Sequence, residues 1–256
     1  MTQELRLDVD GAVGTITIDR QAKLNTITPE MGRTLTAIAD EVNARAEVRV
    51  VVLCGAGDRA FSAGSDVGVL DDYGDNWSLR NRTDYVRAVL AIRKPVIASV
   101  HGYAIGGGME LALACDVRYA ARDAQFGAGE IKLGWCGGAG ETQILPRIVG
   151  AGNALHMLLT GDMVGADEAF RIGLVQKVVE VEELQDEVQA LAERIAANAP
   201  IACQIVKHLV RVAQSTALDV GLSYENDLFA YCFTTSDSAE GRAAFAEKRP
   251  PRFEGR

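Results

Sequence analysis

The sequence has no long apolar run and contains fewer basic than acidic side chains. No segment approaches the ~20 consecutive apolar residues of a membrane-spanning helix. There are 26 Lys and Arg against 35 Asp and Glu, which gives a formal net charge of −9. Because nucleic acids and anionic membranes are bound by basic surfaces, we expect neither as a partner, although a local basic patch could hold a small phosphorylated ligand.

The first residues, MTQELRLDVDG, lack the basic start and apolar stretch of a secretory signal peptide. We therefore expect a cytoplasmic protein. The length of 256 residues suits one large domain or a domain with a subdomain. A chain of this size buries about three quarters of its unfolded surface, so a real hydrophobic core is expected.

Cysteine and histidine are few and scattered. The cysteines are Cys54, Cys115, Cys136, Cys203 and Cys232. They form no C-x-x-C pair, which favours core thiols over a disulfide framework or a zinc site. The histidines are His101, His156 and His208. Their spacing is not that of metal ligands, so we predict no metal site.

Strand and helix signals alternate along the first two thirds of the chain. Residues 12–19, 48–54 and 95–102 are rich in Val, Ile and Thr and are predicted as strands. Thr28 and Pro29 resemble the start of a helix, and a further helix is expected at 109–115 before a strand at 116–121. This order predicts an α/β fold with parallel strands and right-handed crossovers.

The last third of the chain is predicted to be helical. An amphipathic helix is expected from 181 to 195, and further helical segments at 205–212 and 218–229. These helices are expected either to pack on the α/β core or to reach away from it. The polar segment 71–78 is predicted as an exposed, mobile loop.

Two familiar motifs are excluded by their context. The segment GAGDRA at 55–60 matches a loose dinucleotide fingerprint, but it does not open a helix and no acidic residue follows a second strand at the required distance. Ser65 is not in a G-x-S-x-G sequence, so a serine hydrolase is not indicated.

Two glycine-rich segments follow predicted buried strands, FSAGSD at 61–66 and IGGGME at 105–110. Glycine allows the backbone to approach a ligand closely, and the N–H groups at a helix start attract negative charge. Two such loops that meet could each donate one N–H to a single oxygen and form an oxyanion hole. The alternative is that these glycines only permit tight turns or close packing.

Two glutamates accompany these loops. Glu110 is placed in the first turn of an apolar helix, and Glu130 follows another glycine-containing loop. Carboxyl groups in partly apolar surroundings can have their pKa values pushed apart and divide acid and base roles. The alternative for each is a helix-capping or surface glutamate.

In this order, FSAGSD, HGYAIGGGMELALACDVRYA, AQFGAGEIKLG and GAGETQILPRIVG resemble the crotonase superfamily, that is, the enoyl-CoA hydratase/isomerase family. The likeness extends to the C-terminal FAEKRPPRF. It implies an α/β crotonase-like spiral of ββα units at 1–195, followed by a helical trimerisation region at 196–256. It also implies a homo-oligomer, either a trimer or a dimer of trimers, that binds an acyl-CoA thioester without metal or redox cofactor.

The resemblance further implies roles for individual residues. The backbone N–H groups of Ser65 and Gly107 would stabilise a thioester enolate, so the Ser65 side chain is not expected to be a nucleophile. Glu110 would help to activate a water, and Glu130 would give a proton to the α-carbon. The residues expected along coenzyme A are Ala22, Lys23, Leu24, Ala63, Ser65, Asp66, Val67, Gly68 and, from a neighbouring subunit, Lys248. An ordinary surface lysine is the alternative for Lys248.

The sequence departs from the family pattern at several positions. Gly68 stands where a lysine is common, which predicts one missing phosphate contact, and Gly129 stands where many hydratases have proline. In GWCGGAGETQ, Cys136 and Gly137 occupy the apolar and proline positions, and Glu141 replaces a glycine. Trp135, in the same segment, is expected to narrow the acyl pocket, and Glu141 to add a third charge nearby.

The predicted reaction is reversible addition of water to the double bond of a 2-enoyl-CoA thioester, because both glutamates are retained. Double-bond isomerisation and dehydration of a carnitinyl-type thioester are the nearest alternatives. A non-catalytic or RNA-binding relative is a further alternative, which the net charge of −9 disfavours.

Overall fold

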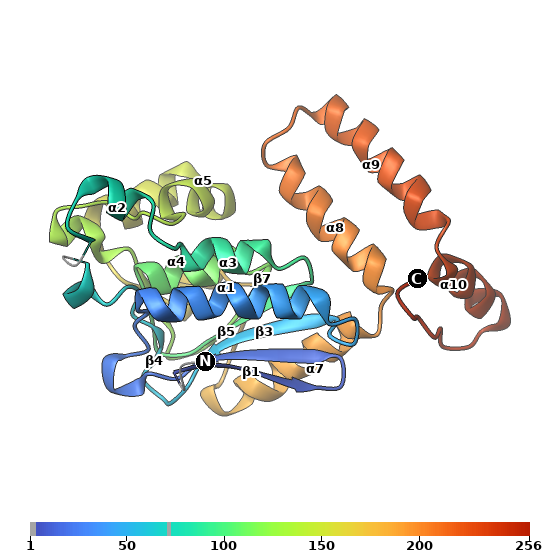
Figure 1. Ribbon diagram of the computed structural model, residues 1–256, viewed down its shortest axis with the longest axis horizontal. Coiled ribbons are helices and arrows are strands. Elements are labelled where there is room, and N and C mark those ends of the chain that lie inside the picture. The colour runs from blue at the N-terminus through green and yellow to red at the C-terminus, as the bar shows by residue number, and fades with distance from the viewer. Residues whose placement is uncertain (1–3, 71–72) are drawn as a thin grey trace.

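The computed structural model describes residues 4–70 and 73–256 as two sheets surrounded by helices (Figure 1). The larger sheet has the order β1-β2-β3-β5-β7-β10 and the smaller one β4-β6-β8-β9. The strands of the larger sheet are β1 (Leu5–Asp10), β2 (Val13–Ile18), β3 (Val50–Gly55), β5 (Val96–Val100), β7 (Val117–Ala121) and β10 (Lys177–Val179). Those of the smaller sheet are β4 (Ala60–Ser62), β6 (Tyr103–Ile105), β8 (Gln125–Gly127) and β9 (Val164–Gly165).

The helices follow the strands in a repeating order. They are α1 (Pro29–Ala44), α2 (Asn76–Arg80), α3 (Tyr85–Ala91), α4 (Gly107–Ala114), α5 (Glu141–Thr160), α6 (Ala166–Arg171), α7 (Leu184–Ala196), α8 (Pro200–Ala213), α9 (Leu218–Phe233) and α10 (Ser236–Glu247). Short 3-10 turns lie at Gln21–Lys23, Val67–Val69, Gly129–Leu133 and Val181–Glu183. The pairs β3–β4, β5–β6 and β7–β8 each place one strand in each sheet before helices follow, which is the ββα repeat expected of a spiral.

Parallel pairing dominates the centre of the larger sheet. Strand β3 pairs in parallel with both β2 and β5, and β5 pairs in parallel with β7. All five residues of β5 are buried, as expected for an apolar strand covered on both faces. The β1–β2 pair is an antiparallel hairpin that we did not predict, although the alternation of apolar and polar residues in Leu5–Asp10 is typical of an edge strand.

Helices cover both faces of this sheet. Figure 1 shows α1, α3 and α4 on one side and α7 on the other. Helix α1 begins as predicted, with Pro29 at its first position and the Thr28 hydroxyl accepting the Met31 N–H. On the opposite face, Leu184 and Val188 of α7 belong to the same buried cluster as Val50 of β3. The sheet is thus enclosed in a two-sided core.

The C-terminal helices reach away from the α/β core, one of the two arrangements that we expected. Figure 1 shows α8 and α9 as a pair of helices beyond one end of the sheets, with α10 beside them, whereas α2 and α5 lie at the other end. Large apolar side chains are exposed on this pair, among them Val206, Val210, Leu218 and Phe229. The division at residue 195 and the oligomeric role of residues 196–256 stay predictions.

Some local predictions were wrong. Helix α2 lies in the segment predicted as a loop, because Asp75 caps it by accepting the N–H groups of Trp77 and Ser78; residues 71 and 72 of that segment lie outside the described residues. Helix α10 was not predicted. Of the cysteines expected in the core, Cys115 is buried but Cys136 is exposed. Within residues 4–70 and 73–256, no helix is both long and apolar enough to cross a membrane.

Candidate active site

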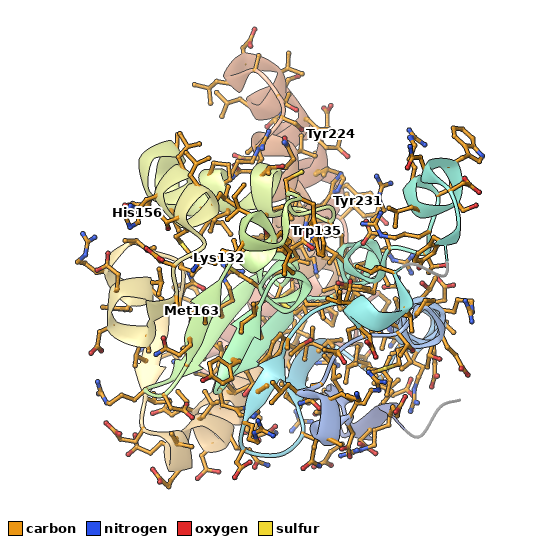
Figure 2. The ribbon with its side chains drawn as sticks, turned by 90° about the vertical axis from the view of Figure 1, so that its left-hand side faces the viewer. Lys132, Trp135, His156, Met163, Tyr224 and Tyr231 are labelled. Carbon is orange, nitrogen blue, oxygen red and sulfur yellow. The ribbon has the colours of Figure 1, made fainter. Side chains whose placement is uncertain are left out.

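A cavity of about 800 Å³ opens where the two glycine-rich loops end. Its walls come from the loop after β4, the start of α3, the β6–α4 junction and residues 129–139. The lining residues that concern us are Ser65, Tyr85, Gly107, Glu110, Glu130 and Trp135. Figure 2 views the molecule from this side, with Lys132 and Trp135, both of which line the cavity, near the middle of the view.

The two glycine-rich loops are in direct contact. Gly64 has a φ of +84°, and a Cβ added to it would lie 2.7 Å from the amide nitrogen of Gly107. A Cβ on Gly107 would overlap the Tyr85 hydroxyl, and one on Gly108 would overlap the carbonyl oxygen of Ser62. Gly106 has a φ of +54°. The glycines therefore do permit close packing, and the same packing brings the amides of the two loops together.

The amide groups of Ser65 and Gly107 face no acceptor in the described part of the chain. Gly107 is the first residue of α4, and first-turn N–H groups have no acceptor within their own helix. Ser65 forms an isolated parallel bridge with Ile27, and its hydroxyl is 2.9 Å from that of Tyr85. Two adjacent backbone donors at the rim of one cavity can hold one oxygen that carries negative charge.

Glu110 is buried at the start of α4, with 3% of its surface exposed. Its Oε1 atom accepts the Ala139 N–H at 2.7 Å and the Glu141 N–H at 3.2 Å. Burial raises the pKa of this carboxyl, and the two backbone N–H groups act in the opposite direction. Since both hydrogen bonds end on Oε1, the other oxygen is available to a molecule in the cavity.

Glu130 lies across the cavity in the 3-10 turn Gly129–Leu133. A Cβ on Gly106 would overlap its Oε1 atom, so this glycine makes room for the carboxyl. Its Oε2 atom is buried and has no hydrogen-bond partner among the described residues. Burial raises the pKa of Glu130, and its own backbone N–H and then the neighbouring Glu141 carboxyl act in the opposite direction. The two glutamates predicted from the sequence are thus brought to one cavity.

A third carboxyl group, that of Glu141, lies beside these two. It belongs to the first residue of α5, is 1% exposed and does not itself line the cavity. Burial, followed by the charges of Glu130 and Glu110, raises the pKa of Glu141 to about 9. The sequence predicted a third charge here. The Glu141 carboxyl does lie beside the other two, and its charge at neutral pH stays a prediction, because two neighbouring carboxyls in a buried site favour the protonated form.

The loops predicted to contact coenzyme A also lie together. Ala22 and Lys23 are in the 3-10 turn Gln21–Lys23, and the Leu24 carbonyl accepts the Ala63 N–H at 2.9 Å. Arg20, which begins the first of these loops, donates to Asp66 Oδ2 at 2.8 Å and joins the two loops, a pairing that the sequence did not indicate. This arginine lowers the pKa of the Asp66 carboxyl.

The other predicted coenzyme A contacts differ in their position. Val67 and Gly68 form a 3-10 turn after Asp66, and Val67 is exposed. Lys248 ends α10, which lies at the end of the molecule opposite to α2 and α5 (Figure 1). The fold of a single chain does not bring Lys248 to the cavity, so its proposed contact requires a neighbouring subunit.

The departures in residues 129–137 have different structural settings. A Cβ on Gly129 would meet only the Ile105 side chain, at 3.8 Å, so a larger residue would fit there. Trp135 and Cys136 both line the cavity, and Trp135 remains 42% exposed. The narrowing of the acyl pocket by Trp135 stays a prediction.

The sequence matches a known protein family and is similar to named enzymes. Residues 8–256 match the family described as enoyl-CoA hydratase/isomerase. The chain is 37% identical to the short-chain-enoyl-CoA hydratase of Clostridium acetobutylicum, over 95% of this chain and 94% of that one. It is 39% identical to the crotonyl-CoA hydratase of Syntrophomonas wolfei, over 98% of each.

A solved structure extends the likeness to the fold. The crystal structure of an enoyl-CoA hydratase from Bacillus anthracis superposes on this structure with a TM-score of 0.92, at 36% sequence identity. The match covers 99% of this chain and 100% of the other. The α/β spiral with C-terminal helices predicted from the sequence is thereby confirmed.

Proposed function

This chain belongs to the enoyl-CoA hydratase/isomerase family, and from that membership we propose how its cavity acts. The enzyme is a hydro-lyase that adds water reversibly to the double bond of a 2-enoyl-CoA thioester, as the names of its relatives indicate for them. The observation that carries the mechanism is the placing of Glu110 and Glu130 on the walls of one cavity, beside the amides of Ser65 and Gly107.

The thioester oxygen binds to the two backbone N–H groups. As the β-carbon is attacked, negative charge moves onto this oxygen, and the N–H groups of Ser65 and Gly107 stabilise it. Such donors are already oriented by the packing of Gly64 against Gly107, so little reorganisation is needed during the reaction. Loss of one donor of this kind typically costs about 10²- to 10³-fold in rate.

The two glutamates divide the proton transfers. Glu110 takes a proton from water through the oxygen not held by the Ala139 and Glu141 amides. The resulting hydroxide bonds to the β-carbon, and Glu130 gives a proton to the α-carbon. Burial raises the pKa values of both carboxyls toward the pH at which the enzyme works. A pKa in that range suits general acid and general base catalysis.

Coenzyme A is part of the substrate in this proposal, and no further cofactor takes part, because addition of water transfers no electrons. Its phosphates and adenosine would lie along residues 22–24 and 63–68. Lys248 of a neighbouring subunit would meet a phosphate. Exposed apolar side chains on α8 and α9 support a homo-oligomer, either a trimer or a dimer of trimers.

The retained pair of carboxyls favours hydration over the other reactions of the family. Isomerisation of a double bond needs only one base, whereas here two carboxyls face the same space. A carnitinyl-type dehydratase would use the same pair in the opposite direction. We therefore place hydration first and treat the other two reactions, together with RNA binding, as outcomes of the test.

The test is a substrate panel of 2-enoyl-CoA thioesters, beginning with crotonyl-CoA. We expect loss of the absorbance of the conjugated thioester and a product heavier by one water. An isomerised product of unchanged mass would contradict hydration. Salt-sensitive RNA retention on a filter without turnover would point to the non-catalytic alternative. The Glu30→Gln variant, which changes an exposed glutamate in the first turn of α1, is the matched control and should hydrate normally.

A further inference from the structure

Two departures from the family pattern, at residues 137 and 141, depend on each other because they compete for the same space. Gly137 stands at the proline position and Glu141 at a glycine position. A Cβ on Gly137 would overlap Oε2 of Glu141 and would lie 3.0 Å from its Cβ. The Glu141 side chain therefore occupies the space that a side chain at 137 would fill. A glutamate is accommodated at 141 because residue 137 is glycine.

With Glu141 in this position, three carboxyl groups lie together in a carboxyl cluster, defined as Glu110, Glu130 and Glu141. The Glu141 N–H donates to Glu110 Oε1 at 3.2 Å, and Glu141 Oε1 and Glu130 Oε2 are both buried without a hydrogen-bond partner among the described residues. In the described residues, no basic side chain forms an ion pair with any of the three. Since like charges at short range disfavour joint ionisation, the cluster retains at least one proton near neutral pH.

The other charged and titratable groups around the cavity do not neutralise this cluster. Arg82 donates to the carbonyl oxygens of Leu79 and Gly138, and Lys132 pairs with Asp162 at 3.5 Å. Asp84 caps α3, and the Tyr85 hydroxyl pairs with that of Ser65. None of these contacts supplies a counter-charge to Glu141, whose Oε1 atom is also buried without a partner among the described residues.

We propose that Glu141 is a positioning residue that shares one proton with Glu130 and thereby keeps Glu130 able to protonate the substrate α-carbon up to mildly alkaline pH. The inference rests on the proposed hydratase function. Glu141 does not line the cavity, so it acts through Glu130 and not on the substrate. The pKa of about 9 for Glu141 agrees with a proton that the pair keeps at neutral pH.

The proton balance of the step closes. Hydroxide from water bonds to the β-carbon and the second proton of that water goes to Glu110. The one proton that Glu130 and Glu141 share moves to Glu130, and the electron pair of the double bond forms the new bond from the α-carbon to that proton, which leaves both carboxyls of the pair ionised. The cycle ends when the proton on Glu110 returns to the Glu130–Glu141 pair as the product leaves.

The decisive experiment is the pH profile of kcat/KM with crotonyl-CoA for the unmodified enzyme and for Glu141→Gln, with Glu30→Gln as control. We expect the alkaline limb to lie near pH 9 in the unmodified enzyme. In Glu141→Gln it should move down by at least about one pH unit, a loss of about tenfold at pH 9, with little change at pH 6. An unmoved limb overturns the proposal, whereas absence of hydration by the unmodified enzyme overturns the proposed function instead.

A second measurement needs neither substrate nor activity. Carboxyl-carbon NMR of glutamate-labelled protein should show one carboxyl that titrates near pH 9 and disappears in Glu141→Gln. If every carboxyl is ionised by neutral pH, the proposal fails. Gly137→Ala provides an independent perturbation, since its added methyl group overlaps the Glu141 carboxyl and should move the same resonance without altering any charge.

Discussion

Two buried charge clusters in this molecule are built in opposite ways. The carboxyl cluster at the cavity contains three acids and no base. The second cluster, defined as Asp116, Lys207 and Arg211, joins the core to α8. In it, Lys207 Nζ is 2.6 Å from Asp116 Oδ2, and Arg211 Nη2 is 3.1 Å from Asp116 Oδ1.

The Asp116 cluster is satisfied by its surroundings. Lys207 also donates to the Lys94 carbonyl at 2.7 Å, and Asp116 accepts the Val96 N–H at 2.7 Å. Burial lowers the pKa of Lys207 to about 8 although Asp116 acts in the opposite direction, so the ammonium remains charged at neutral pH. Opposite charges with complete hydrogen bonding are consistent with a structural role.

The carboxyl cluster shows the contrary pattern. Its like charges and unpartnered oxygens are unfavourable for folding, and groups of this kind with shifted pKa values gather at functional sites. Burial of charged groups alone therefore does not identify a functional site. The sign of the neighbours decides whether a buried group serves stability or chemistry.

The largest expected effect is on activity, from a change in the carboxyl cluster. Glu130→Gln removes the proposed proton donor and should lower kcat/KM for hydration by about 10³-fold. Because it also removes one of three like charges, thermal denaturation should show an unchanged or higher Tm. Retained hydration in this variant would contradict the role assigned to Glu130.

Loss of a charge in the Asp116 cluster should act mainly on the stability of the fold. Asp116→Asn leaves Lys207 and Arg211 without their counter-charge, and breaking a buried pair in this way costs about 3 kcal/mol of unfolding free energy. Urea unfolding measures the loss. If hydration per folded molecule fell as strongly as stability, the two clusters would not be separate in function.

The clusters should also differ in how stability depends on pH. The folded-state pKa of Glu141 is raised above its ordinary value of 4.5 to about 9, so the folded protein binds the proton more tightly than the unfolded chain. The unfolding free energy should therefore fall as pH rises between these values, by roughly 2 to 3 kcal/mol from pH 6 to pH 8, because one additional bound proton changes it by about 1.4 kcal/mol per pH unit. Glu141→Gln should flatten this slope in denaturation curves recorded across the range. An equally steep slope in the variant would assign the effect to other groups.

The smallest effect is expected from a neutral hydrogen bond at the same cavity. Tyr85→Phe removes the contact between the Tyr85 and Ser65 hydroxyls but keeps the ring packed against Gly107. The loss should be about 1 kcal/mol of unfolding free energy, with only a few-fold change in kcat/KM. Steady-state kinetics and thermal denaturation give both numbers. A much larger loss of activity would show that this hydroxyl, and not only charge, takes part in the reaction.

Much of the core could be predicted because its signals are local. The Val-rich run at 48–54 becomes β3, and Thr28-Pro29 does start α1. Edge strand β1 and the short helix α2 were not predicted although each carries a local signal, the alternation in Leu5–Asp10 and the N-cap residue Asp75. Both elements are short, with six and five residues, so the signal of each is brief.

At the site, residue types were predictable but their interplay was not. Glu110, Glu130 and the two glycine loops could be named from motifs, and the fold brings them to one cavity. Arg20 gave no motif signal, and its ion pair with Asp66 spans two loops. Lys248 could be named from the family, but it follows α10, which lies at the end of the molecule opposite to α2 and α5 (Figure 1).

By itself the sequence determined the strand and helix order, the glycine positions and the family, because each depends on residue type and spacing along the chain. That Glu141 fills the space left by Gly137, and that burial beside two carboxyls raises its pKa to about 9, depends on the tertiary structure alone. A pKa depends on burial and on which charges lie within a few ångströms, and those neighbours come from α4, a 3-10 turn and α5.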